Sequence, residues 1–290
     1  MNRYIGVLAV VTLSRVIADG AWADGAKGVL VGMAGGLAGG LIAGAIGLVT
    51  VPLIAIAFGL PVPVAAATNL FQTIFTAGSG ALAHAGKGHA HPRLAGTLLA
   101  GAVVGAPLGA WLSLRTPEVW LRWLFVVLLL GMAGQLVRRM SGPSERRMGA
   151  WLAKRLEGSQ HAITGTFQDQ TWSVAPVLAV GLGAAIGLAS GLLGIGGGFL
   201  FTPLVAMVLH VPTRLALGTG LLAIAGNSLF ATVPHLLAGT VWFTVGLALA
   251  VGGSLGATWG SALSHRLPER GILGLFVVML VLVAWQMAPV

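Results

Sequence analysis

The sequence predicts an all-α polytopic membrane protein with two inverted four-segment repeats, each starting with a broken Gly/Pro helix hairpin. Hydrophobic residues make up 57% of the 290 positions and charged residues only 8%, whereas soluble domains carry about a quarter charged residues. Apolar stretches of about 20 residues, the length that crosses a bilayer core of ~30 Å, recur along the chain. The alternating segments of about ten residues typical of an outer-membrane barrel are not visible. Composition and segment length together argue against a water-soluble fold.

The charge distribution supports the same fold class. The formal net charge is +9, but the Lys and Arg residues lie between the apolar stretches, as in cytoplasmic loops of a membrane protein. We therefore expect the lipid bilayer, and no nucleic acid, as the surrounding partner. The chain has no Cys and 45 Gly. Disulfides and thiolate metal sites are excluded, and close helix packing with several helix breaks is favoured.

The apolar stretches divide the chain into four predicted parts. These are a signal-like segment or a short N-terminal helix (1–27), a first transmembrane repeat (28–137), a basic cytoplasmic linker (138–173) and a second transmembrane repeat (174–290). Both interpretations of residues 1–27 stay open, because an early Arg, an apolar stretch and Ala21-Trp22-Ala23 follow the order of a signal peptide. We expect the linker to be amphipathic or mobile and to lie on the anionic inner leaflet.

One sequence offset relates the two halves. Pro52 and Pro203 stand in similar motifs, 151 positions apart (203 − 52). The same offset pairs Pro61 with Pro212, Thr68 with Thr219, His84 with His235 and Glu118 with Glu269. Between Gly88 and Pro117 we expect the register to slip by four, because Leu108-Gly109-Ala110 matches Leu255-Gly256-Ala257. Coinciding Pro, His and Glu pairs indicate an internal duplication.

The first apolar stretch of each half is too long for one crossing. Residues 28–60 as a single helix would span about 50 Å at ~1.5 Å per residue. Each stretch has a Gly-rich middle, at Gly44–Gly47 and Gly194–Gly198, followed by Pro52 or Pro203. Because Pro is tolerated in a first helical turn, we expect a break and then a short helix starting near each Pro. If each pair forms a hairpin, the halves have opposite orientations, which also places more Lys and Arg on the linker side.

These breaks are the predicted binding site. A helix that starts inside the membrane has unpaired N–H groups and a partial positive charge, and irregular backbone persists there only when it lines a cavity. The candidate residues at the breaks are Gly47, Thr50, Gly194, Gly196, Gly197, Gly198 and Thr202. The structural alternative is that these glycines only allow helices to pack closely.

Polar residues on the next helix of each half complete the candidate site. They are Asn69, Gln72 and Thr76 in the first half, and Thr219, Asn227 and Ser228 in the second. Such groups either join helices or bind a substrate, because an unpartnered amide or hydroxyl is costly in a bilayer. No Asp, Glu, Lys or Arg lies deep in a predicted span, which suits an anion held by neutral donors rather than a cation cage.

The histidines form a weaker signal. His84, His89 and His91 lie close together in sequence, but no carboxylate accompanies them, so we favour a solvated loop over a metal site. A pH-sensitive gate is the other interpretation. We expect no metal and no cofactor.

The segment from Gly191 to Leu204, Gly-Leu-Leu-Gly-Ile-Gly-Gly-Gly-Phe-Leu-Phe-Thr-Pro-Leu, resembles the motif of the TauE/SafE-type sulfite exporter family. The resemblance covers about residues 28–287, and the first half departs from the motif at Ala45, Leu48 and Val49. It implies a secondary transporter of sulfite, thiosulfate, an organic sulfonate or a related organic acid in the bacterial inner membrane. The direction and any coupling proton or Na⁺ stay open.

Other function classes fit less well. An intramembrane enzyme would need a nucleophile, base or metal cluster inside the spans, and none is visible, so we expect no enzyme. An anion channel and a membrane scaffold without transport remain as alternatives, although neither explains two Gly-rich breaks.

Overall fold

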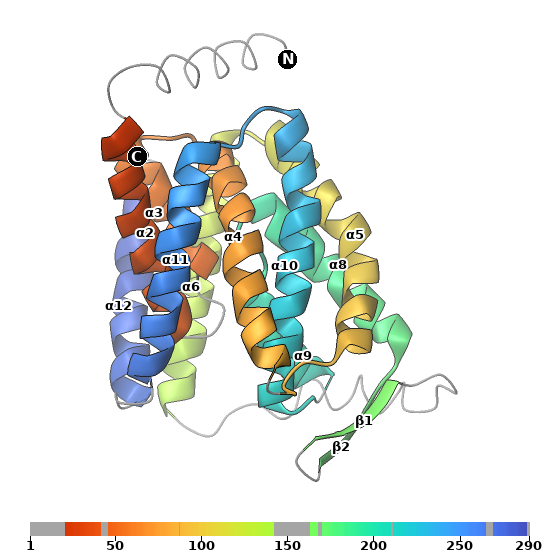
Figure 1. Ribbon diagram of the computed structural model, residues 1–290. Coiled ribbons are helices and arrows are strands. Elements are labelled where there is room, and N and C mark those ends of the chain that lie inside the picture. Colours follow the sequence, from red (N-terminus) through yellow and green to blue (C-terminus); the bar gives the residue numbers. More distant parts are fainter. Residues whose placement is uncertain are drawn as a thin grey trace.

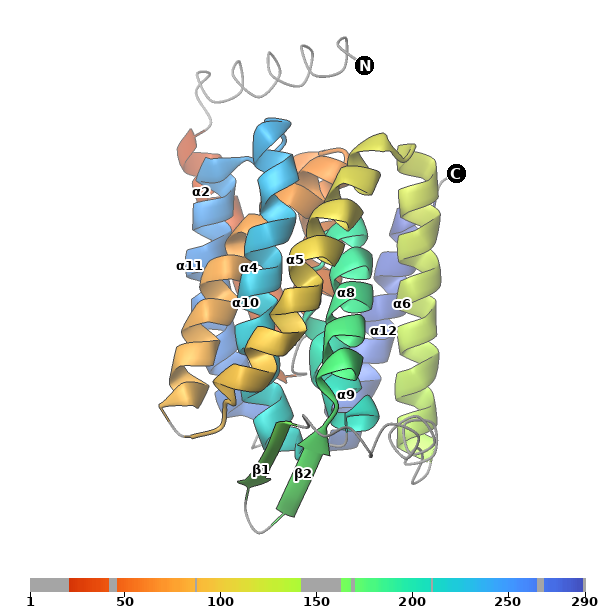
Figure 2. The ribbon, with the colours of Figure 1, turned by 90° about the vertical axis from the view of Figure 1, so that its right-hand side faces the viewer.

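The computed structural model describes residues 21–41, 46–86, 88–141, 163–167, 170–209, 211–264 and 269–288. Long helices lie side by side in one bundle, with a β-hairpin at one end (Figures 1 and 2). By length and composition, four helical stretches of the described chain can cross a membrane: Pro92–Arg115, Pro176–Leu193, Leu215–Leu237 and Phe243–Gly260. The predicted all-α, multi-pass membrane class is confirmed.

The elements follow the same order in both halves. The first half contains α2 (Ala21–Leu41), α3 (Ile46–Phe58), α4 (Val62–Ala85), α5 (Pro92–Arg115) and α6 (Glu118–Ser141). The second contains α8 (Pro176–Leu193), α9 (Gly198–Val208), α10 (Thr213–Leu237), α11 (Phe243–Ser264) and α12 (Glu269–Met287). Two strands, β1 (Ile163–Phe167) and β2 (Gln170–Val174), lie between the halves. The predictions for residues 1–20 lie outside the described residues, and α2 begins at Ala21.

The short helices α3 and α9 begin before Pro52 and Pro203, the positions near which the sequence predicted their starts. α3 starts at Ile46 and contains Pro52 in its interior, and residue 203 likewise falls within α9. An internal Pro removes one backbone hydrogen bond, here to the carbonyl of Leu48. The loss is tolerated because the helix around Pro52 is mainly apolar and is buried from Leu48 to Pro52, and buried Pro is accommodated in membrane helices. The predicted helix starts near Pro52 and Pro203 are therefore wrong.

A single offset relates the starts of the last three helices of each half. α4 and α10, α5 and α11, and α6 and α12 each begin 151 residues apart (213 − 62, 243 − 92, 269 − 118). The register slip expected between Gly88 and Pro117 is wrong, because α5 and α11 keep this offset. The Leu-Gly-Ala match that suggested the slip is a coincidence in a Gly- and Ala-rich stretch.

Glycines set the closest helix contacts, and these contacts join the two halves. α8 packs along α5 and α2 packs along α11. A Cβ at Gly105 would overlap the carbonyl of Ala184 on α8, and a Cβ at its counterpart Gly256 would overlap the carbonyl of Met33 on α2. Gly101, Gly109, Gly252 and Gly260 lie equally close to the backbone of the same partner helices. For these residues the packing interpretation of glycine is correct, and small residues serve as the interface.

The linker contains a β-hairpin that the sequence interpretation missed. β1 and β2 pair antiparallel, from Ile163 with Val174 to Phe167 with Gln170. Trp172 and Val174 are buried whereas Ser173 is exposed, so the side chains alternate with the period of two expected for a strand. The buried face joins a core cluster that includes Val205 and Leu209. Residues 142–162 of the linker lie outside the described residues.

Candidate functional site

The break between α8 and α9 is a buried glycine turn. α8 ends at Leu193 and α9 begins at Gly198, which confirms the predicted break at Gly194–Gly198. Gly194, Gly196 and Gly197 have φ values of 68°, 72° and 83°, the left-handed region that glycine adopts without a Cβ clash. The left-handed residues end one helix and immediately begin the next, so two sets of helix termini meet in the interior. We refer to residues 194–197 as the glycine turn.

A polar row on α4 reaches the glycine turn from the first half. The side-chain amide Nδ2 of Asn69 donates to the carbonyl of Gly194 at 2.7 Å. Gln72 Nε2 donates to Asn69 Oδ1 at 3.0 Å, and Thr76 Oγ1 donates to Gln72 Oε1 at 3.1 Å. These three side chains are buried. Each amide is therefore oriented by the next residue along the row.

A second amide reaches the turn from α10. Asn227 Nδ2 donates to Ser190 Oγ at 2.7 Å and to the Gly196 carbonyl at 3.2 Å. Both N–H groups of this amide are thereby used. In the part of the chain that the structure describes, Asn227 Oδ1 and the Ser228 hydroxyl are buried and have no hydrogen-bond partner. Buried polar atoms without partners are rare and call for an explanation, such as a missing ligand or water.

Gly196 lies between the two polar helices. A Cβ at Gly196 would stand 2.8 Å from Thr73 Cγ2 on α4 and 3.1 Å from Ser228 Oγ on α10. A Cβ at Gly197 would meet the ring of Phe201 at 3.0 Å. A side chain at Gly196 would therefore fill the space between α4 and α10 as well as strain the backbone.

The other predicted residues divide into those that lie at the glycine turn or at the helix that follows it and those whose hydroxyl groups bond elsewhere. Gly47 of α3 packs against the carbonyl of Ile195 in the turn, and Thr202 Oγ1 would lie 3.1 Å from a Cβ at Gly220 of α10. Gly198 is the first residue of α9. The hydroxyl bonds of Thr50 and Thr219 lead elsewhere. Thr50 donates to the Ile46 carbonyl in its own helix, and Thr219 accepts the N–H of His91 at 3.0 Å.

Ser190 was missed as a site residue. It lies one turn before the end of α8, is fully buried, and accepts the amide of Asn227. The signal available in the sequence was a single small polar residue just before a Gly-rich break. That signal is weak, because a Ser in an apolar helix usually bonds to its own backbone, as Ser190 also does with the Gly187 carbonyl.

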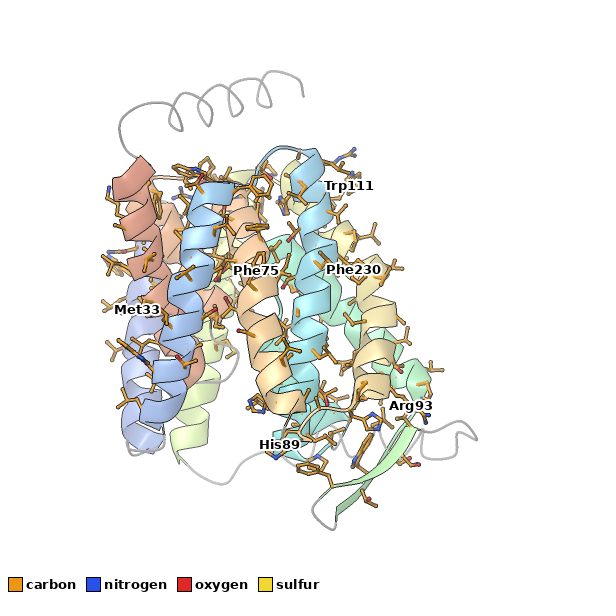
Figure 3. All side chains as sticks on the ribbon, in the orientation of Figure 1. Met33, Phe75, His89, Arg93, Trp111 and Phe230 are labelled. Atoms are coloured by element: carbon orange, nitrogen blue, oxygen red, sulfur yellow. The ribbon has the colours of Figure 1, made fainter. Side chains whose placement is uncertain are left out.

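The predicted histidine cluster contacts the β-hairpin. The His91 ring packs on Trp172 at 4.9 Å between centroids and the His89 ring on Phe167 at 5.6 Å, and Figure 3 shows His89 at the hairpin end of the bundle. His91 Nδ1 accepts the N–H of Leu94 at the start of α5. Burial, and then the charge of Arg93, lower the pKa of His91 below its ordinary value. Its neutral form therefore caps the helix.

Comparison with known proteins places the chain among transporters. It matches the family model described as Sulfite exporter TauE/SafE over residues 28–287. It is 25% identical to the "Probable membrane transporter protein YunE" of Bacillus subtilis (strain 168), over 91% of this chain and 93% of the relative. It is 30% identical to a "Probable membrane transporter protein" of Xylella fastidiosa (strain Temecula1 / ATCC 700964), over 82% of this chain and 87% of the relative. No solved structure matches.

Proposed function

Because this chain belongs to the TauE/SafE sulfite exporter family, a family of membrane transporters, we propose that it carries a small anion by alternating access. The cargo is sulfite, thiosulfate or an organic sulfonate, and the membrane is the bacterial inner membrane. Binding takes place at the glycine turn, between the two halves of the molecule. A coupling proton or Na⁺ is compatible with this scheme.

The observation that carries the proposal is a buried glycine turn held between α4 and α10. N–H groups at the start of α9 have no partner inside the helix, and the helix end carries a partial positive charge. Glycines let an anion approach these N–H groups closely. The Ser228 hydroxyl, which has no partner within the described residues, supplies one more donor beside Gly196. No formal charge is needed to hold the anion.

The asparagines then act as positioning residues. Asn69 and Asn227 direct their amide N–H groups at the carbonyls of Gly194 and Gly196. A carbonyl oxygen carries partial negative charge and would repel an anion. Binding these oxygens to amides satisfies them and leaves the N–H side of the turn for the cargo. The substrate-contact role that the sequence suggested for Asn69 and Asn227 thus becomes an indirect one.

Alternating access needs two halves that can exchange roles, and an inverted repeat supplies them. In this proposal residues 28–137 and 174–290 are the repeats, and residues 138–173 are the cytoplasmic linker. The common offset of 151 residues in three pairs of helix starts supports it. So do α3 and α9, which Figure 1 places toward opposite ends of the bundle.

Cysteine labelling tests the orientation of the first half and of the linker. The chain has no Cys, so Thr116→Cys and Ser173→Cys each introduce a unique thiol. The proposal expects an impermeant thiol reagent to label position 116, but not position 173, in intact cells. Both positions should react after the membrane is opened. Labelling of position 173 from outside would overturn the cytoplasmic linker and the assigned orientation.

Counterflow in proteoliposomes tests the transport site. Labelled sulfite, thiosulfate and a sulfonate are offered to vesicles preloaded with the same unlabelled anion, which also separates a carrier from an anion channel. Gly196→Ala should lower the initial rate about tenfold or more, equivalent to roughly 1.4 kcal/mol or more. The matched control is Gly239→Ala, which has φ of 66° and no atom within 4 Å of the new Cβ. Equal rates for the two variants would contradict a site at the glycine turn.

A further inference from the structure

A cavity whose lining does not include the glycine turn lies at the end of the bundle where α3 ends and α6 begins. Its volume is about 380 Å³, and its lining includes Ile56, Leu60, Glu118, Arg122, Gln286 and Met287. The walls from α3 and α12 are mainly apolar, while the first turn of α6 supplies a carboxylate and a guanidinium. Neither charged group takes part in the proposed transport site.

The ion pair in this cavity leaves hydrogen-bonding groups available to a ligand. Arg122 Nε and Nη2 donate to Glu118 Oε1 at 3.0 and 2.7 Å, and the backbone N–H of Val62 approaches the same oxygen at 3.5 Å. All three contacts converge on Oε1. Two of the five guanidinium N–H donors are used in this way, so donors remain on Arg122 and acceptor capacity remains on Oε2. The cavity therefore offers one positive and one negative group to the same ligand.

The surrounding surface places this cavity at a membrane interface. Trp120 and Trp123 stand near the start of α6, and Trp285 stands near the end of α12; all three are exposed. Exposed Trp residues at the ends of membrane helices lie at the level of the lipid headgroups. The apolar wall beside the ion pair therefore lies at the level where a lipid headgroup joins its acyl chains.

We propose that this cavity binds the headgroup of a phospholipid with a primary ammonium, such as phosphatidylethanolamine. The lipid phosphate accepts from the remaining N–H groups of Arg122, and its ammonium donates to Glu118 Oε2. The glycerol and the first acyl carbons lie against Ile56, Leu60 and Met287. Because the protein groups sum to zero charge, a zwitterion satisfies both, whereas a purely anionic lipid gains from Arg122 but is repelled by Glu118.

The test is lipid retention by the full chain purified in detergent, measured by native mass spectrometry. Phosphatidylethanolamine is compared with phosphatidylcholine, whose methylated ammonium has no N–H, and with phosphatidylglycerol, which lacks the ammonium. The wild type should prefer phosphatidylethanolamine to both. Glu118→Gln should reduce this preference about fivefold, because a charged hydrogen bond is lost, and Arg122→Gln should weaken retention of all three lipids.

Two further variants keep the outcome decisive. Ile56→Trp fills the cavity without altering the ion pair, and it should abolish the preference even if Glu118→Gln destabilises the fold. Arg115→Gln removes a guanidinium that stacks on Trp111 outside this cavity, and it should retain the wild-type preference. An unchanged preference in both Glu118→Gln and Ile56→Trp would overturn the proposal. Displacement of the lipid by soluble phosphoethanolamine at equal concentration would instead identify a soluble ligand and overturn the lipid assignment.

Discussion

The helices α4 and α10 occupy corresponding places in the two halves, yet only part of their polar chemistry is shared. Thr68 of α4 accepts the N–H of Trp242, just before α11, and Thr219 of α10 accepts the N–H of His91, just before α5. These two hydrogen bonds are counterparts at the offset of 151. Each joins one half to the other at the start of a long helix. The same hydrogen bond between the halves therefore occurs twice in the molecule.

Within the next turn after these threonines, the two helices differ. Asn69 of α4 corresponds to Gly220 of α10, and Gln72 corresponds to Ala223. The amide of α4 crosses to the glycine turn of the second half, whereas the amide of α10, Asn227, serves the turn of its own half. Both helices thus hold the same turn. The comparison teaches that the described scaffold contacts are symmetric, while the amides of both helices meet at the second break; residues 42–45 of the first break lie outside the described residues.

The largest expected effect tests the symmetric part. Gly105→Ala and Gly256→Ala each place a Cβ against a partner backbone carbonyl, and overpacking of this kind costs about 2–3 kcal/mol. Both variants should lower the thermal midpoint in detergent by similar amounts. Gly181→Ala, whose Cβ meets no atom within 4 Å, should keep the wild-type midpoint or raise it. Tolerance of one variant but not the other would break the correspondence between α5 and α11.

The next effect tests the asymmetric part. Asn69→Ala leaves the Gly194 carbonyl without its amide, and Asn227→Ala leaves the Gly196 carbonyl without one. A buried acceptor without its partner costs about 1–3 kcal/mol. We expect both variants to lose thermal stability and transport, and the double variant to lose less than the sum because both residues hold one turn. Additive losses would show that the two amides act on separate sites. Thr97→Val, which removes a hydroxyl bonded within its own helix, is the control.

A smaller and matched effect is expected at the two shared hydrogen bonds. Thr68→Val and Thr219→Val each remove one acceptor from a backbone N–H, at a cost of about 1 kcal/mol. Thr68→Ser and Thr219→Ser keep the hydroxyl and should recover most of the loss. Unfolding curves of all four variants check this. A loss confined to one half would mean that only one of the two hydrogen bonds supports the fold.

The smallest effect concerns pH and distinguishes the halves again, because the counterpart of His91 is Trp242, which does not titrate. The pKa of His91 is lowered in the folded protein by burial and by Arg93, so the unfolded chain takes up a proton first. Its stabilising contribution is complete above the unfolded pKa of about 6.5 and declines as the pH falls below it.

His91→Asn keeps a helix-capping acceptor and removes this titration. Between about pH 7.5 and about pH 5.5, on either side of the ordinary pKa, the wild type should lose more thermal stability than the variant. Equal losses would show that His91 does not contribute to the pH dependence of stability.

The fold was predictable from the sequence wherever a single segment carries the signal. Hydropathy identified the membrane helices, and Gly194–Gly198 identified the break, because both signals are local. The start of α3 was placed too late, because Pro52 suggested a first turn while the burial that tolerates an internal Pro depends on the rest of the fold. The β-hairpin was missed because two strands of five residues give little signal in a polar linker.

The candidate site was predictable in composition but not in roles. Asn69, Gln72 and Asn227 were singled out because amides in a bilayer need partners. The partner of Asn69 is a carbonyl 125 residues away, and the choice of that atom depends on how α4 meets α8. Thr219 was assigned to the site by the same reasoning, yet its partner is the N–H of His91. A residue type indicates the need for a partner, whereas only tertiary contacts determine which partner it is.

The packing of α2, from the first half, against α11, from the second half, also affects how the chain folds during synthesis. Gly32 contacts the backbone of Leu249, so these two surfaces are separated by 217 residues of chain (249 − 32). While the ribosome is still making the second half, the glycine face of α2 has no partner, and neither has that of α5 until α8 emerges. The first half alone is therefore an incomplete folding unit. The contact between α2 and α11 forms only after α11 enters the membrane, when the intervening helices have already been made.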